Sequence, residues 1–472
     1  MSSPSLVLPE HLSLQHHQTA RDKVVSTCRL PAGTVILSVR SLTSMLLPRE
    51  KGRRCDFCHS LAPQDRGRLQ RCTGCASYWY CDAKCQSLHW RTHKKYCKHV
   101  NAFCAERQFD QLESHSKLDA LLLTYVLAEL SARRTETKEG DDLDVLMFVS
   151  LLPGPVEGMD APPTCPLSTS HRPVQTASEL FVRCGNNNFS IHSHLTTIAH
   201  GVFPLASRLF NHSCVPNAVA KYRIAHAKEA VMEIVALRDI VPGEEICIPY
   251  VDPALVETRQ QMFRFTYGFA CICPSCAAFK RIDTSQPAPD KAGLESLGTS
   301  LRKFVFQDPR PDKTRLPSSP VNLETVPVEI SPIFRESCLT SLCESFSAFS
   351  HDGPFESALE VGLTILAFYV VIYPPNYPQI GIFPSHFPLE PGSFLCPPGM
   401  HLLEMAKTAW NAFITMEGAE TQLSGLKLLL QVRAFLGLSR QIWAVIGPEG
   451  DEGGPLAEIQ VLERLLSEQE PP

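Results

Sequence analysis

The cysteines are the residues whose spacing most clearly indicates chemistry, because 10 of the 19 fall in two short clusters and an eleventh, Cys214, can complete the second. The first cluster supplies eight soft or borderline metal ligands in four pairs: Cys55 and Cys58, Cys72 and Cys75, Cys81 and Cys85, and His93 and Cys97. The gap of two or three residues within each pair lets both side chains reach one ion, and Zn2+ prefers four tetrahedral sulfur or nitrogen ligands. Eight ligands predict two closed structural zinc sites, on which a segment so poor in aliphatic residues would depend to fold.

The second cluster holds three cysteines within six residues, Cys271, Cys273 and Cys276. Three thiolates occupy three corners of a tetrahedron and leave the fourth corner empty. Cys214, which lies 57 residues before Cys271, is the natural fourth ligand. A third zinc ion would then hold the segment around Cys214 against the segment that carries Tyr267 and Phe269.

The composition is that of a globular chain, with 472 residues, 44% of them hydrophobic, and a formal net charge of −5. This length predicts several domains at about 150 residues each. The longest nearly unbroken apolar run, 363–373, is shorter than the ~20 residues of a membrane span. Residues 1–18 lack the charged and apolar regions of a secretory signal. We therefore expect an intracellular protein without a transmembrane helix, in which clustered cysteines hold metal.

The remaining pattern indicates the elements that position these ligands. Turn and strand signals in 20–48 and again in 230–237 predict a β region that is interrupted and then resumes. Apolar residues at helical spacing in 117–131 predict a helical insert. Pro-rich and Asp-rich stretches follow residue 284, and from Ile333 onward the periodicity is helical, with one helix around 426–435 and another around 459–466.

The order of the first ligand pairs, with Tyr80 before Cys81 and with Gln86, Trp90 and His93 following, resembles the MYND zinc finger. That resemblance implies interleaved pairs. One ion would take Cys55, Cys58, Cys81 and Cys85, and the other would take Cys72, Cys75, His93 and Cys97. MYND fingers typically bind peptides, so we expect a proline-rich peptide partner. Residues 51–98 carry eleven Lys and Arg against three Asp and Glu, but the whole chain is acidic, so nucleic-acid binding is expected to be weak or absent.

The string Asn-His-Ser-Cys-Val-Pro-Asn at 211–217, the run from Gly243 to Asp252, and the string from Tyr267 to Cys276 resemble a SET domain with its post-SET zinc site. A MYND finger inserted in a SET domain resembles the SET and MYND domain-containing (SMYD) lysine methyltransferases, over residues ~20–280 in order. The tail resembles that family's TPR-like C-terminal domain, most closely at 373–381 and 400–411.

The predicted fold class is therefore α+β. A mostly-β SET domain would be split by a MYND finger and a helical insert, and would be followed by a post-SET zinc site and an α-helical TPR-like domain. The predicted boundaries are 1–50 for the N-terminal SET segment, 51–98 for the finger, 99–190 for the helical insert, 191–252 for the core SET segment, 253–280 for the post-SET segment, 281–330 for a linker and 331–472 for the tail.

Membership would imply methyl transfer from S-adenosylmethionine to the ε-amine of a target lysine in a histone or non-histone protein. By motif match, Tyr250 and Tyr267 would line the lysine channel and orient the amine. Asn211 and His212 match cofactor-holding positions, Phe269 matches the aromatic that packs on the adenine, and Asn187 matches a further cofactor contact more weakly. Glu244 and Glu245 follow a turn and are interpreted as solvated carboxylates. A monomer in the nucleus and/or cytoplasm is expected.

Two departures from the family keep an alternative open. Arg21, Asp22 and Lys23 stand where SET domains usually have a Gly-x-Gly loop that lets the backbone approach the cofactor. Residues 382–399 interrupt two stretches that run together in the family, as a surface loop or a translated intron. The alternative function is a catalytically degenerate adaptor or transcriptional co-regulator that binds peptides through the finger.

Overall fold

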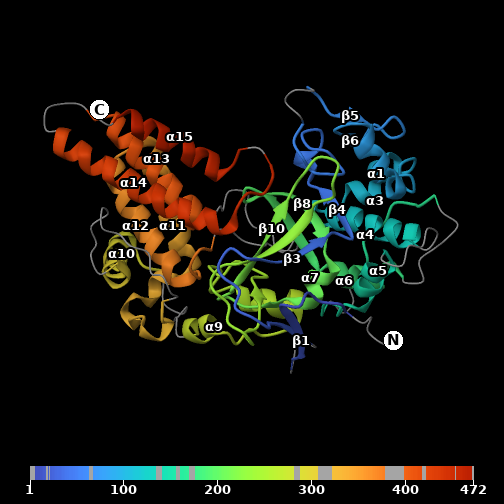
Figure 1. The fold of residues 1–472 in the computed structure, drawn as a ribbon, viewed down its shortest axis with the longest axis horizontal. Coiled ribbons are helices and arrows are strands. Elements are labelled where there is room, and N and C mark those ends of the chain that lie inside the picture. Colours follow the sequence, from blue (N-terminus) through green and yellow to red (C-terminus); the bar gives the residue numbers. More distant parts are fainter. Residues whose placement is uncertain are drawn as a thin grey trace.

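The structure is a computed structural model that describes residues 6–17, 20, 22–62, 67–133, 141–155, 160–168, 176–280, 288–306, 321–377, 398–416, 421–451 and 453–469. Figure 1 shows strands in the middle of the molecule, the cysteine-rich segment and its helices on one side, and the C-terminal helices on the other. Most of the 382–399 interruption and Arg21 lie outside the described residues.

The β region consists of small sheets formed by strands distant in sequence. Its strands are β1 (Leu12–His16), β2 (Asp22–Ser26), β3 (Val35–Arg40), β4 (Thr43–Leu46), β7 (Asn188–Ser193), β8 (Thr196–Val202), β9 (Asn211–His212), β10 (Ala218–Arg223), β11 (Val231–Ala236) and β12 (Cys247–Ile248). The orders are β10-β11-β3 and β4-β8-β7, with β1 paired to β2 and β9 parallel to β12. Strands therefore lie in 20–48 and at 231–236, as the sequence predicted, and the chain returns to the same sheets after a long interruption.

The interruption begins with the cysteine-rich segment, which contains β5 (Gln70–Arg71), β6 (Trp79–Tyr80) and α1 (Ala83–His93). The helices that follow are α2 (Val100–Ala105), α3 (Arg107–Asp110), α4 (Ser114–Arg133), α5 (Asp141–Ser150) and α6 (Ala177–Cys184), so the predicted helix at 117–131 lies inside α4. The ring of Tyr96 stacks on Tyr125 of α4 with centroids 4.9 Å apart. Because the two parts share one buried cluster, the cysteine-rich segment is packed against the helical insert.

The remaining short helices lie within the β region or between it and the tail. They are α7 (Pro204–Leu209), α8 (Arg259–Met262), a π-helical turn (Phe263–Tyr267) and α9 (Pro274–Phe279), with 3-10 turns at Pro48–Glu50, Leu323–Thr325 and Val328–Phe334. A π-helix is rare, and within helices it often marks a functional site.

The tail is helical and has its own core. Its helices are α10 (Lys291–Phe306), α11 (Glu336–Asp352), α12 (Phe355–Ile372), α13 (Pro398–Ile414), α14 (Thr421–Ile446) and α15 (Pro455–Glu468). The last two coincide with the helices predicted around 426–435 and 459–466. Helix α10 lies within the predicted linker 281–330, and its buried Leu294 and Leu301 join the tail core at helical spacing.

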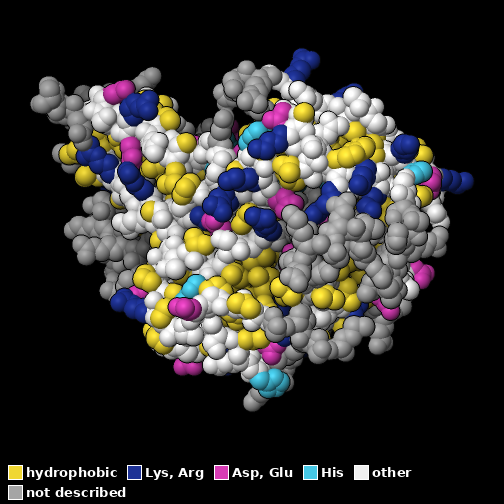
Figure 2. Space-filling model, turned by 45° about the vertical axis from the view of Figure 1, so that its right-hand side comes forward, with side chains coloured by type: hydrophobic (Ala, Val, Ile, Leu, Met, Phe, Trp, Pro, Cys, Tyr) yellow, Lys and Arg dark blue, Asp and Glu magenta, His cyan; other side chains and the backbone are white. Residues whose placement is uncertain are grey.

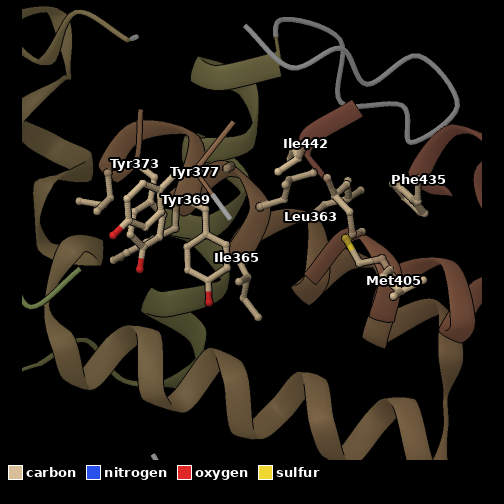
Figure 3. Close-up of a cluster of buried hydrophobic side chains, with 14 of the residues drawn as sticks. Leu363, Ile365, Tyr369, Tyr373, Tyr377, Met405, Phe435 and Ile442 are labelled. Atoms are coloured by element: carbon tan, nitrogen blue, oxygen red, sulfur yellow. The ribbon is translucent and has the colours of Figure 1, made fainter. Parts of the chain in front are cut away.

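Helix α12 is the centre of this core. Within the described residues it is the helix long and apolar enough to cross a membrane by length and composition, but 67% of it is buried among its neighbours. Figure 3 shows Tyr369, Tyr373 and Tyr377 gathered at one end of the cluster, with Leu363 and Met405 toward the other. Burial on this scale identifies α12 as a core helix.

The loop between α14 and α15 joins the tail to both other parts. Asp451 pairs with Arg54, whose Nη1 lies 2.7 Å from Oδ2, and accepts a hydrogen bond from Ser193 Oγ at 2.5 Å. Lys221 Nζ donates to the carbonyl of Ile446 at 2.7 Å. Gly450 has a φ of +86°, and a Cβ there would lie 2.6 Å from the Ile224 carbonyl oxygen, so this close approach needs glycine.

Substitution of Asp451 by Asn tests this junction. The Arg54–Asp451 pair is nearly fully buried, with side-chain exposures of 8% and 5%. Arg54 also pairs with the buried Glu50, so loss of the Asp451 carboxylate removes one of its two negative partners, and we expect the free energy of unfolding to fall by about 2 kcal/mol. The measurement is chemical denaturation. The matched control is Glu463→Gln, whose exposed pair with Arg440 should change stability by less than about 1 kcal/mol. Equal effects of the two substitutions would contradict the predicted role.

Candidate active site and zinc centres

The first centre brings together four buried thiols of the cysteine-rich segment. Their sulfur atoms lie within 4.8 Å of one another, and they belong to Cys55, Cys58, Cys81 and Cys85. The Cys58 sulfur is 3.6 Å from that of Cys81 and 3.9 Å from that of Cys85. A tetrahedral ion with bonds of about 2.3 Å to sulfur separates its ligands by about 3.8 Å. The spacing and the donor set therefore fit Zn2+.

The second centre has three thiols and one imidazole. The ligand atoms again lie within 4.8 Å of one another, and they come from Cys72, Cys75, His93 and Cys97. The sulfur atoms of Cys72 and Cys97 are 3.8 Å apart, and His93 Nε2 lies 3.5 Å from the Cys75 sulfur. The structure thus groups the eight ligands in the interleaved sets that the resemblance implied, and zinc binding itself stays a prediction.

The third centre joins two segments that are distant in sequence. Cys214 follows β9, and its sulfur lies 3.5 Å from that of Cys276 in α9. The four ligand atoms within 4.8 Å of one another belong to Cys214, Cys271, Cys273 and Cys276. Burial raises the pKa of the Cys214 thiol well above its ordinary value, so the thiolate needs a neighbouring cation. This arrangement also fits one tetrahedral Zn2+.

The third centre fixes one side of an aromatic cluster. The chain runs from α8 through the π-helical turn to Tyr267 and turns at Gly268, whose φ is +74°, before it reaches Phe269 and Cys271. On the other side β9 pairs with β12, which places Ile248 opposite His212 and leads directly to Tyr250. The two segments therefore converge.

Tyr250 and Tyr267 form a close pair in this cluster. Their ring centroids are 4.9 Å apart, at an angle of 42°. The Tyr250 hydroxyl donates to the carbonyl of Phe210 at 2.7 Å, whereas the Tyr267 hydroxyl donates to the carbonyl of Tyr250 over a long 3.4 Å. Burial raises the pKa of both phenols above the ordinary value of Tyr, so both stay neutral near pH 7. The structure brings both predicted catalytic residues together.

His212 links the third centre to the tyrosine pair. Its Nδ1 accepts a hydrogen bond from the Tyr250 backbone N–H at 2.9 Å, and its Nε2 lies 3.2 Å from the Cys214 sulfur. Burial lowers the pKa of His212 to about 3, so the ring is neutral and can accept this bond. In the structure this residue holds the backbone of Tyr250, in addition to the cofactor contact predicted for it.

Of the other predicted cofactor residues, Phe269 lies in this cluster, whereas Asn211 contacts Asp22 and Glu245. The ring of Phe269 stacks on Phe263 at 5.1 Å and is half-buried, so part of its surface stays accessible, as an adenine-binding ring requires. Asn211 donates its amide to the Asp22 carbonyl at 2.9 Å and to Glu245 at 2.8 Å.

Asn187 lies just before β7, and its amide donates to the Arg183 carbonyl at 2.9 Å. The described hydrogen bonds and ring contacts of Asn187 do not join it to the tyrosine pair. Beside it, the Oδ1 atom of Asn188 is buried, and no described group donates to it. A ligand with an amino or hydroxyl group fits that acceptor.

The stretch that replaces the expected Gly-x-Gly loop forms part of a hairpin. Asp22 opens β2, which pairs with β1, and its carboxylate forms an ion pair with Arg208 of α7. Arg208 precedes Asn211 by three residues, and the Asp22 carbonyl accepts the Asn211 amide. The hairpin is therefore tied to the Asn211 segment through side chains, where a glycine loop would use bare backbone.

Sequence reasoning missed two contributors and undervalued two others. Phe263 packs against His212 with ring centroids 4.3 Å apart, and Arg259 is buried beside the third centre. Glu245, interpreted as solvated, accepts the Asn211 amide, and Glu244 accepts the Asn217 amide at 3.0 Å. Phe263 could have been found from its spacing, because it precedes Tyr267 by four residues. Nothing in the local sequence indicated that Glu244 and Glu245 accept hydrogen bonds from Asn217 and Asn211.

The model of the SET domain family matches residues 22–251. The chain is 26% identical over 373 residues to the zebrafish (Danio rerio) N-lysine methyltransferase SMYD2-B, which covers 72% of this chain and 80% of the relative. It is 23% identical over 367 residues to the human (Homo sapiens) N-lysine methyltransferase SMYD2, with the same coverage. Residues 22–251 are therefore a SET domain, and most of the chain is similar to protein-lysine methyltransferases of the SMYD type.

A solved structure of the SET domain of LSMT bound to lysine and AdoHcy matches at 11% identity with a TM-score of 0.25, and the match covers 98% of this chain and 88% of that chain. The SET domain match begins at Asp22 and ends at Val251. It therefore starts at the hairpin strand that stands in place of the glycine loop and reaches the residue after Tyr250.

Metal analysis of the purified protein tests the centres directly. We expect three zinc ions per chain and two in Cys214→Ala, since removal of the fourth ligand opens the third centre. The control is Cys165→Ala, a buried thiol outside all three centres, which should keep three ions. Two ions in the unchanged protein, or three in Cys214→Ala, would contradict the assignment of Cys214.

Proposed function

We propose that this chain transfers a methyl group from S-adenosylmethionine to the ε-amine of a lysine in a histone or non-histone protein. The observation that carries the proposal is the contact between Tyr250 and Tyr267, held between the third centre and the β9–β12 pairing. When bound, S-adenosylmethionine supplies a sulfonium methyl group that is open to displacement by a neutral amine. Phe269, His212, Asn211 and, more weakly, Asn187 are the residues proposed to hold it.

The tyrosine pair supports this chemistry by its surroundings. A lysine amine with a pKa near 10.4 must lose its proton before it can react, and an apolar aromatic wall disfavours the charged ammonium form. Because the two phenols are themselves neutral, they add no negative charge that would favour the ammonium. The pair therefore provides walls and hydroxyl dipoles without a charged group.

The two hydroxyls are held differently, and this suggests separate roles. The 2.7 Å bond from Tyr250 to the Phe210 carbonyl fixes that ring as a wall. The 3.4 Å bond from Tyr267 is at the limit of a hydrogen bond, so little is lost when the hydroxyl turns toward an amine. We assign Tyr267 the orientation of the amine and Tyr250 the shape of the channel.

Further properties belong to the proposal as expectations. We propose three structural zinc ions, a MYND finger that binds a proline-rich peptide, a TPR-like tail, a monomeric state, and a location in the nucleus and/or cytoplasm. Figure 2 shows acidic side chains between the Lys and Arg side chains on the face it presents. Such an interrupted basic surface favours protein partners over strong nucleic-acid binding.

Substitution of each tyrosine by phenylalanine tests the catalytic assignment. Tyr267→Phe should lower kcat by about tenfold or more, because one productive hydrogen bond is worth about 1.4 kcal/mol, and Tyr250→Phe should lower the rate or change the degree of methylation. The readouts are labelled methyl transfer to proteins of a cell lysate and mass spectrometry of the products. Tyr222→Phe, a buried tyrosine of β10, is the control. Wild-type rates and products in both site variants would refute the assignment.

The pH dependence of kcat/KM provides an independent test. The reactive amine gains its neutral form as pH rises, so the rate should increase between about pH 7 and pH 9. The raised pKa of Tyr250 and Tyr267 keeps both phenols neutral over this range, so they should cause no fall in rate. A fall in kcat/KM below pH 9, in a protein that stays folded, would contradict the proposal that both phenols are neutral.

A further inference from the structure

Arg259, the first residue of α8, is a cation buried in an unusual way. Only 1% of its surface is exposed. Its guanidinium donates from Nη1 to the Pro253 carbonyl at 2.6 Å and from Nη2 to the Ser275 hydroxyl at 3.0 Å. Its Nε atom is buried without a hydrogen-bond partner. Both acceptors are neutral, and in the part of the chain that the structure describes Arg259 forms no ion pair with a carboxylate.

A buried guanidinium without a counter-charge is strongly unfavourable, so a negative partner is needed. Arg259 reaches the third centre through the Ser275 hydroxyl, and its guanidinium carbon also lies 5.7 Å from the centroid of the Phe279 ring. Ser275, which accepts from Arg259, lies in α9 between Cys273 and Cys276 and is fully buried.

The charge of the third centre matches this requirement. One Zn2+ with four thiolates keeps two negative charges, and this centre is enclosed on the side of Cys214 and Cys276. A buried cation beside it offsets part of that charge, and the anionic centre in turn stabilises the cation. Each group therefore removes much of the desolvation cost of the other.

We propose that Arg259 is the counter-charge of the zinc centre formed by Cys214, Cys271, Cys273 and Cys276, and is thereby a positioning residue for Tyr267. Helix α8 continues directly into the π-helical turn that ends at Tyr267, so the attraction between Arg259 and the centre draws that turn toward the Cys214 segment. The inference rests on the zinc centre of the proposed function, and it holds whether or not the chain transfers methyl groups.

Zinc release to a chelator from the full-length protein tests the role of the charge. Arg259→Gln keeps hydrogen-bond donors and loses the charge, so one zinc ion should be released about 10–100-fold faster than in the unchanged protein. Arg259→Lys keeps the charge and should slow that release toward the unchanged rate. The two ions of the other centres are the internal control and should keep their rates in both variants.

A charge rescue separates this role from a purely structural one. Cys273→His in the Arg259→Gln background replaces a half-buried thiolate by a neutral ligand and lowers the negative charge of the centre, so the third ion should again be released slowly. If Arg259→Gln alone fails to fold, the rate of zinc release from the double variant still tests the proposal. Release from Arg259→Gln within about twofold of the unchanged protein, equal weakening by Gln and Lys, or failure of the rescue would each overturn the proposal.

Discussion

The rest of the site depends on one constraint, the meeting of the Cys214 sulfur with three sulfurs that follow more than fifty residues later. The regular backbone pairing at this point is small, because β9 and β12 are each two residues long. The distances between the sulfurs suit one tetrahedral ion, whose binding free energy would then serve as folding free energy. This constraint positions the aromatic cluster that contains Tyr250 and Tyr267. Without it, a two-residue strand pairing and the packing of a few buried side chains such as Phe263 would have to hold Tyr250 against Tyr267.

The metal ligands could be predicted from sequence because their information is local. Pairs two or three residues apart can serve one ion in almost any fold, and Cys214 followed once three thiols were seen to lack a fourth. The tyrosine and phenylalanine positions needed the family resemblance, since a single buried Tyr is usually part of a core. Phe263 and Arg259 were missed because their roles depend on what the folded chain places beside them, and a cation on a short helix has no distinctive pattern.

In the tail, too, elements with a local pattern could be predicted from sequence, and contacts between distant residues could not. Parts of α14 and α15 could be predicted from the spacing of apolar residues. Helix α10 was assigned to a linker because Pro-rich stretches flank it. The junction could not be predicted. Arg54 and Asp451 are 397 residues apart, and only the folded chain shows that one carboxylate contacts the start of the cysteine-rich segment and the β7 strand. Tyr373 similarly donates to Asp252 at 2.6 Å, so a tail residue contacts the segment that follows Tyr250.

The central claim is that a metal ion joins the two segments and so brings the tyrosine pair together. Crystallography of the purified protein at the zinc absorption edge tests it most directly. The account predicts an anomalous peak about 2.3 Å from each of the four sulfurs of the third centre, with the rings of Tyr250 and Tyr267 in contact beside it. A Cys214 side chain turned away from Cys271, Cys273 and Cys276, or two tyrosine rings in separate cavities, would contradict it.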